Sequence, residues 1–170
     1  MEYFFKLLKM LFAIQLLNNV CNAVINIQDK IILKEETIII EKPIMKLEIP
    51  KINFKGNIYN VHSELNDIDK NIIIMKDSDM PDEKNSILII GGHSGYGKYA
   101  YFDNLKELKK DDNVSLTYKN KKYNYKIINH YLDSKDGSIS VNNYKDKNIL
   151  ILYTCYTDKK NYLVYVAEMV

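Results

Sequence analysis

Residues 113–132 read NVSLTYKNKKYNYKIINHYL and carry the clearest structural signal in the chain. Two runs with strand-like periodicity, Asn113–Tyr118 and Tyr123–Leu132, lie on either side of the polar tip Lys119–Lys122. Two runs of this length around a short polar tip predict a β-hairpin, because the tip can turn while the runs pair. The same kind of short apolar run recurs along the chain on both sides of this hairpin.

Further strands are predicted over most of residues 45–170. The candidate runs are Lys46–Ile49, Asn57–Tyr59, Ser86–Ile90, Ile149–Thr154 and Tyr162–Met169. Ser63 is placed as the N-cap of a short helix over 64–70, and residues 101–109 space their apolar side chains on one face of a second short helix. About eight short strands with few helices predict an all-β domain, an eight-stranded closed or nearly closed β-barrel.

The N-terminal segment, residues 2–28, differs from the rest. Lys6 and Lys9 precede the uncharged stretch Met10–Gln28, which is long enough to cross a bilayer as a helix with the lysines on the cytoplasmic side. Because the stretch contains several asparagines, three interpretations stay open: a signal anchor, a cleaved signal peptide, or an amphipathic helix packed on the domain. The first two place the remaining chain outside the cytoplasm, and the signal anchor, which we favour, holds the domain on the extracytoplasmic face of the cell membrane. Residues 29–44 are expected to form an extended linker or an added edge strand.

Composition excludes several functions. The chain has 170 residues and a net charge of +2, and all 24 of its basic residues are lysine. Dispersed lysines and a charge near zero argue against nucleic-acid binding, and no bidentate guanidinium is available anywhere. Of the two cysteines, Cys21 lies in the N-terminal apolar segment, so Cys155 is expected to be a free thiol.

Cys155 and His93 are the candidates for chemistry. Cys155 ends the run ILILYTC, and His93 follows the run SILIIGG, so both lie at strand ends, where reactive groups can be held rigidly and still be reached. A thiol is only partly ionised at neutral pH, and a nearby imidazole would supply the reactive pair. From the residues alone, Cys155 is a nucleophile or a small core residue. His93 is its partner, or merely follows a tight Gly91-Gly92 turn.

Five segments follow the order and spacing of a sortase: LEIPKI (47–52), NIY (57–59), GGHSG (91–95), YFDNLKELKKDD (101–112) and LYTC (152–155). Sortases are bacterial cysteine transpeptidases, and the resemblance covers roughly residues 45–170. It implies a sortase-type barrel that cleaves an LPxTG-like sorting signal of surface proteins through an acyl-thioester on Cys155. It also implies transfer to an amine acceptor such as a cell-wall precursor. In this resemblance His93 protonates the leaving amine and later deprotonates the incoming one.

The sequence departs from the family pattern where an arginine is expected at the start of the last strand. That position is Tyr162 here. The family arginine holds the substrate and stabilises the oxyanion, so three alternatives follow. We favour the Tyr162 hydroxyl acting with a backbone amide. A charge from Lys159 or Lys160 is the second alternative. The third is an impaired site, which would leave a module that binds sorting signals or a partner protein, because one missing oxyanion donor costs about 10²–10³ in rate.

The remaining candidates are weaker. Thr154 is expected to contact the substrate, and Tyr96 is placed in the substrate groove or on the barrel as a capping aromatic. The acidic residues that could hold calcium are Asp67, Asp69, Asp77, Asp79, Asp82 and Glu83. A solvated loop is the expected role for them, so we predict no metal site and no cofactor. His62 and His130 are expected to be structural, and the resemblance favours a class D-like or class A-like enzyme, with D preferred.

Overall fold

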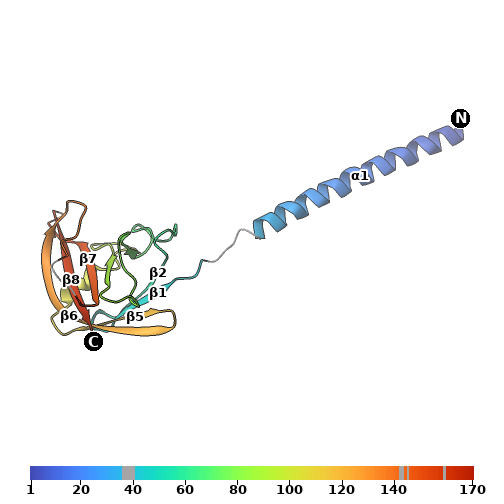
Figure 1. Ribbon diagram of the computed structural model, residues 1–170. Coiled ribbons are helices and arrows are strands. Elements are labelled where there is room, and N and C mark those ends of the chain that lie inside the picture. Colours follow the sequence, from blue (N-terminus) through green and yellow to red (C-terminus); the bar gives the residue numbers. More distant parts are fainter. Residues whose placement is uncertain (36–40, 142–143, 145, 159) are drawn as a thin grey trace. The chain divides into compact units, whose positions relative to one another are not determined.

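The computed structural model describes the chain apart from residues 36–40, 142–143, 145 and 159, drawn in grey in Figure 1, and describes only the backbone of 29–35. It contains two compact units, Met1–Glu41 and Lys42–Val170. Each unit is described by itself below.

The first unit contains one helix, α1 (Glu2–Glu35). The expectation that the chain is extended from residue 29 is therefore wrong as far as Glu35, because adding a residue to an existing helix costs far less than starting one. The part of the helix from Glu2 to Gln28 is long and apolar enough to cross a membrane. A signal sequence meets the same criterion, so the choice between anchor and signal peptide stays open.

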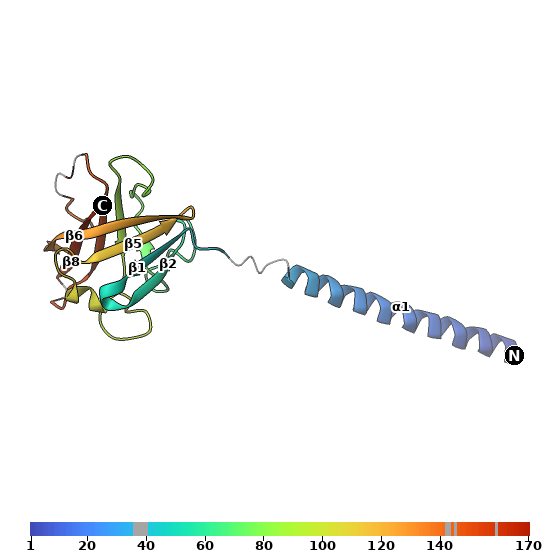
Figure 2. The same cartoon turned by 90° about the horizontal axis from the view of Figure 1, so that it is seen from below.

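The second unit is an eight-stranded, nearly closed β-barrel (Figures 1 and 2). Its strands are β1 (Met45–Ile49), β2 (Phe54–Ile58), β3 (Ile73–Ile74), β4 (Ile87–Gly91), β5 (Asn113–Tyr118), β6 (Lys121–Ser134), β7 (Ile149–Cys155) and β8 (Asn161–Met169). They are ordered β2-β1-β5-β6-β8-β7-β4-β3, and only the β4–β7 pairing is parallel. The two ends of this sheet approach each other, since a Cβ built on Gly56 in β2 would lie 2.9 Å from Cδ1 of Ile72, just before β3. The predicted all-β barrel is confirmed.

The predicted hairpin is β5–β6. Tyr118 pairs with Lys121, and the turn between them is made by Lys119 and Asn120, both with positive φ. Positive φ at both central residues gives the turn a twist that matches that of the two strands. Strand β6 continues to Ser134, beyond its predicted end at Leu132, and this extension matters for the site.

Two local predictions fail. Residues 63–70 form turns instead of a helix. Here the Asn66 side chain accepts a hydrogen bond from the Ile74 backbone N–H at 2.8 Å and donates to the Ile74 carbonyl at 3.1 Å. Side-chain hydrogen bonds of this kind compete with helix formation. The helix expected at 101–109 is a shorter 3₁₀ helix, η2 (Asp103–Glu107), and a second 3₁₀ helix, η1 (Pro50–Ile52), follows β1.

Strand β7 is buried on both faces. Leu150 and Leu152 belong to the main hydrophobic core, while Ile149 and Ile151 pack in a second cluster on the opposite face of the sheet. Successive side chains of a strand point to opposite faces, so a run without polar residues fits a strand covered on both sides. The end of β7, where Cys155 lies, is therefore held firmly.

Candidate active site

Cys155 and His93 meet because β4 and β7 run parallel. Gly91 pairs with Tyr153, so the segments that follow β4 and β7 leave the sheet at the same edge. Three hydrogen bonds fasten them there. The Gly92 N–H donates to the Tyr153 carbonyl at 3.2 Å, the Thr154 hydroxyl donates to the Gly92 carbonyl at 2.7 Å, and the Ser94 hydroxyl donates to the Cys155 carbonyl at 2.6 Å.

The two glycines before His93 are required by close packing. A Cβ on Gly91 would lie 2.4 Å from Cζ of Tyr153, and one on Gly92 would lie 2.8 Å from Cδ2 of Phe102. Neither glycine has the positive φ of a left-handed turn. The glycines therefore let the backbone approach two aromatic rings, whereas the sequence suggested only a tight turn.

Cys155, His93 and Tyr162 line one small cavity of about 220 Å³. Tyr162 lies directly opposite Cys155 in the β7–β8 register. The centres of the Tyr162 and Tyr153 rings are 5.3 Å apart, and the rings are nearly perpendicular. The position that the family pattern gives to arginine is thus beside the thiol, and a phenol occupies it.

The His93 ring has a carboxylate partner. Its Nε2 lies 3.0 Å from Oδ1 of Asp69, and the Asp69 side chain is 83% exposed whereas that of His93 is 39% exposed. Sequence reasoning named Asp69 only as one of several acidic loop residues. The turns over 63–70, which replace the predicted helix, bring it to His93.

A lysine that the sequence did not single out lies beside the thiol. The Nζ of Lys135 is 3.2 Å from Sγ of Cys155 and 5.7 Å from the centre of the Tyr162 ring. The hydrogen bond to Cys155, together with the charge of its thiolate, raises the pKa of the Lys135 ammonium. Nothing local distinguishes Lys135 among 24 lysines, because the pairing of β6 with β8 is what brings it here.

Lys160 is placed differently. Its backbone N–H donates to Oδ1 of Asp158 at 2.9 Å, and its carbonyl accepts from the Lys135 N–H at 3.0 Å. Among the contacts of the described residues, none joins the Lys160 side chain to Cys155. Lys159, the other lysine weighed from the sequence, lies outside the described residues.

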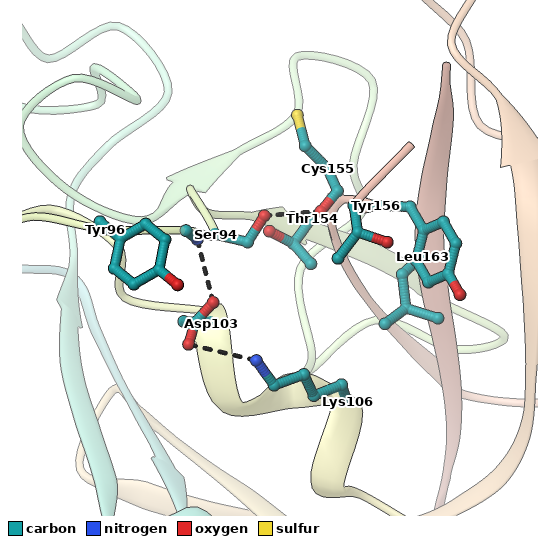
Figure 3. A pocket seen from close by; sticks show the side chains of 10 residues that line it. Ser94, Tyr96, Asp103, Lys106, Thr154, Cys155, Tyr156 and Leu163 are labelled. Carbon is teal, nitrogen blue, oxygen red and sulfur yellow. Dashed lines mark hydrogen bonds and ion pairs between the residues drawn. The ribbon is translucent and has the colours of Figure 1, made fainter. Parts of the chain in front are cut away.

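A larger groove of about 460 Å³ adjoins the thiol (Figure 3). The residues that line it are Ser94, Gly95, Tyr96, Asp103, Lys106, Thr154, Cys155, Tyr156, Thr157 and Leu163. Tyr96 is fully exposed at this groove. Thr154 is buried with its hydroxyl bonded to the backbone, so it supports the groove wall.

The acidic residues considered for calcium are dispersed. Asp67 is bonded to Lys70, Asp69 to His93 and Asp82 to Lys119. In the described part of the chain, no three His, Cys, Asp or Glu side chains gather as a metal site would require. The expectation of no cofactor stays a prediction.

Known proteins share this sequence and fold. The sequence model of the sortase domain matches residues 47–170. Sortase D of Bacillus subtilis (strain 168) is 31% identical over 125 residues, which are 70% of this chain and 60% of that protein. Among solved structures, sortase A from Corynebacterium diphtheriae superposes with a TM-score of 0.68 at 22% identity, covering 76% of this chain and 61% of that one.

A second solved structure, sortase C-1 from Actinomyces oris, gives a TM-score of 0.68 at 20% identity, covering 77% of this chain and 76% of that one. The structural similarities support the fold, and sortases of several classes share it. The sequence match extends from within β1 to the last residue after β8. Because it takes in the whole barrel and not only the residues around Cys155, this chain belongs to the sortase family.

Proposed function

We propose that this sortase is a cysteine transpeptidase that cleaves an LPxTG-like sorting signal and joins the threonine carbonyl of the amino-terminal part to an amine. The observation that carries the proposal is the shared cavity of Cys155 and His93, which opens beside a groove large enough for a peptide. A nucleophile and a proton carrier at one rigid sheet edge are what acyl transfer requires.

The reaction divides into two steps around a thioester. The Cys155 thiolate attacks the threonine carbonyl carbon, and the peptide C–N bond breaks as His93 gives a proton to the departing amine. The incoming amine then gives up a proton to His93 as it attacks the thioester carbon. A new amide forms and the Cys155 thiolate is released. Asp69 holds the orientation of the His93 ring through its contact with Nε2.

The substrates and location follow from the same proposal. Surface proteins bearing a sorting signal are the acyl donors, and a cell-wall precursor or another amine is the acceptor. Helix α1 is the single membrane span, with Lys6 and Lys9 on the cytoplasmic side and the barrel on the extracytoplasmic face. The length and apolar character of Glu2–Gln28 support this arrangement.

Turnover of a quenched sorting-signal peptide tests the proposal. The full-length chain in detergent is assayed with and without an amine acceptor, beside Cys155→Ala and His93→Ala. We expect Cys155→Ala to be inactive and His93→Ala to lose about 10²–10⁴ in rate. Cys21→Ala and His62→Ala are matched controls outside the cavity and should retain wild-type rates. Equal turnover by the wild type, Cys155→Ala and His93→Ala would refute the enzyme.

A further inference from the structure

We propose that Lys135, reaching in from the end of β6, supplies the positive charge of this active site in place of the family arginine. Its ammonium pairs with the Cys155 thiolate in the resting enzyme and donates to the oxyanion during acyl transfer. The second half of this inference rests on the proposed function, whereas the first half concerns the thiol alone.

The geometry puts the charge at the reacting atom. The 3.2 Å separation of Nζ and Sγ is a hydrogen-bonding distance, and Lys135 lines the same cavity as Cys155 and His93. The Lys106 side chain, which lines the adjoining groove, is bonded to Oδ2 of Asp103 at 3.4 Å. Among the lysines that the structure describes in these two cavities, Lys135 is therefore the one paired with the thiol.

The positive charge of Lys135 comes from the end of β6, whereas the family pattern places its arginine at the start of the last strand. Asp133 in β6 and Cys155 in β7 both pair with Tyr162, one from each side of β8. Lys135 lies two residues beyond Asp133, on the same face of the ladder, and its N–H donates to the Lys160 carbonyl at 3.0 Å. Its side chain passes over the Tyr162 ring to reach Cys155. The Lys135 ammonium thus lies beside the thiol and over the ring of Tyr162, the residue at the position of the family arginine.

The segment after Lys135 is held by one carboxylate. Oδ2 of Asp136 accepts from the Ser134 hydroxyl at 3.2 Å, and Oδ1 accepts from the Ser138 hydroxyl at 2.8 Å and from the Ser138 N–H at 3.0 Å. The Lys135 backbone is therefore fixed on both sides, by β8 before it and by this turn after it. A positive group that is already held in place stabilises the negative charge of the oxyanion better than a group that must first be ordered.

An ammonium suits both tasks, though differently from a guanidinium. It offers three donors around one point charge and no planar fork. When the thiolate attacks, its negative charge moves to an oxygen two bonds from Sγ, and an ammonium already beside Sγ can follow it by a small rotation. Lys135 therefore needs no bidentate geometry, which agrees with a chain that has no arginine.

Alkylation of the thiol tests the first half without any peptide substrate. In a full-length Cys21→Ala background, iodoacetamide modification of Cys155 is followed by mass spectrometry across pH. We expect Lys135→Met and Lys135→Gln to slow alkylation at neutral pH by about three- to tenfold, since each removes the positively charged donor that lies 3.2 Å from Sγ. Lys135→Arg should restore the wild-type profile, and Lys84→Met, an exposed lysine outside the cavity, should not alter it.

Peptide turnover by the same variants tests the second half. Lys135→Met should lower turnover by about 10²-fold, as for the loss of one oxyanion donor, and Lys135→Arg should recover most of it. Alkylation unchanged in both Lys135→Met and Lys135→Gln would overturn the inference. If alkylation slows as expected but the wild type turns over no sorting-signal peptide, the charge assignment stands and the proposed function fails.

Discussion

Substitution of Gly91 by alanine should disturb the barrel through Tyr153. A Cβ at residue 91 would lie 2.4 Å from Cζ and 2.5 Å from the hydroxyl oxygen of this ring. Ordinary carbon contacts begin at about 3.5 Å, so the ring would have to move by roughly 1 Å. It has little room, because its hydroxyl donates to Sδ of Met75 at 3.0 Å and the centre of the ring lies 5.3 Å from that of the nearly perpendicular Tyr162 ring.

Overpacking of this kind costs typically 1–3 kcal/mol, and we expect Gly91→Ala to lower the free energy of unfolding by about 2 kcal/mol. The assay is denaturant unfolding of the chain in detergent, in a double-mutant cycle with Tyr153→Leu. Leucine leaves space for the methyl group, so Gly91→Ala should cost little in that background. The coupling between the two sites should then be about 2 kcal/mol, within the range for contacting residues. An equal cost of Gly91→Ala in both backgrounds would refute the contact with Tyr153.

Three further predictions concern the same cavity. Burial raises the pKa of Tyr153 to about 12, so the folded state keeps this proton while the unfolded chain loses it. The contribution of Tyr153 to stability should fall by about 2–3 kcal/mol between pH 10 and 12, measured as the difference in this pH dependence between the wild type and Tyr153→Phe. Asp69→Asn should lower peptide turnover less than tenfold and leave the unfolding midpoint unchanged, since solvent screens this exposed carboxylate; a hundredfold loss would show a larger role for the pair with His93. Tyr162→Arg should rescue turnover in Lys135→Met, because both side chains deliver a cation to one place, and failure of this double variant to exceed Lys135→Met would separate the two positions.

The sequence predicts the barrel because most of its strands can be recognised from the local pattern of polar and apolar residues. Alternation of polar and apolar residues marks β5 and β6, and the unbroken apolar run of β7 marks a strand buried on both faces. Strand β3 was missed because it has only two residues, too few for any periodicity. The helix expected over 64–70 does not form, because the side-chain amide of Asn66 hydrogen-bonds to the backbone of Ile74.

In the candidate site, too, the sequence predicts the residues that are placed by local structure and not those that are placed by tertiary structure. The strand ends predict where Cys155 and His93 lie, because the residue that follows a strand is evident from the sequence. The positions of Lys135 and Asp69 depend instead on strand register and on an irregular loop, and a shift of one residue in register would turn Lys135 to the other face. Lysines spread along the chain give no sign of which one the fold will select.

The parallel pairing of β4 with β7 also determines when Cys155 and His93 can meet during folding. The thiol and the imidazole belong to segments that touch across 62 residues of sequence, as in the bond from Thr154 to Gly92. Contacts this distant form late in folding, after the local hairpins, because the intervening chain must first lose its freedom. A partly folded chain that already contains its β5–β6 hairpin would still not have brought Cys155 and His93 together. The two candidate catalytic residues therefore come together only when β4 pairs with β7.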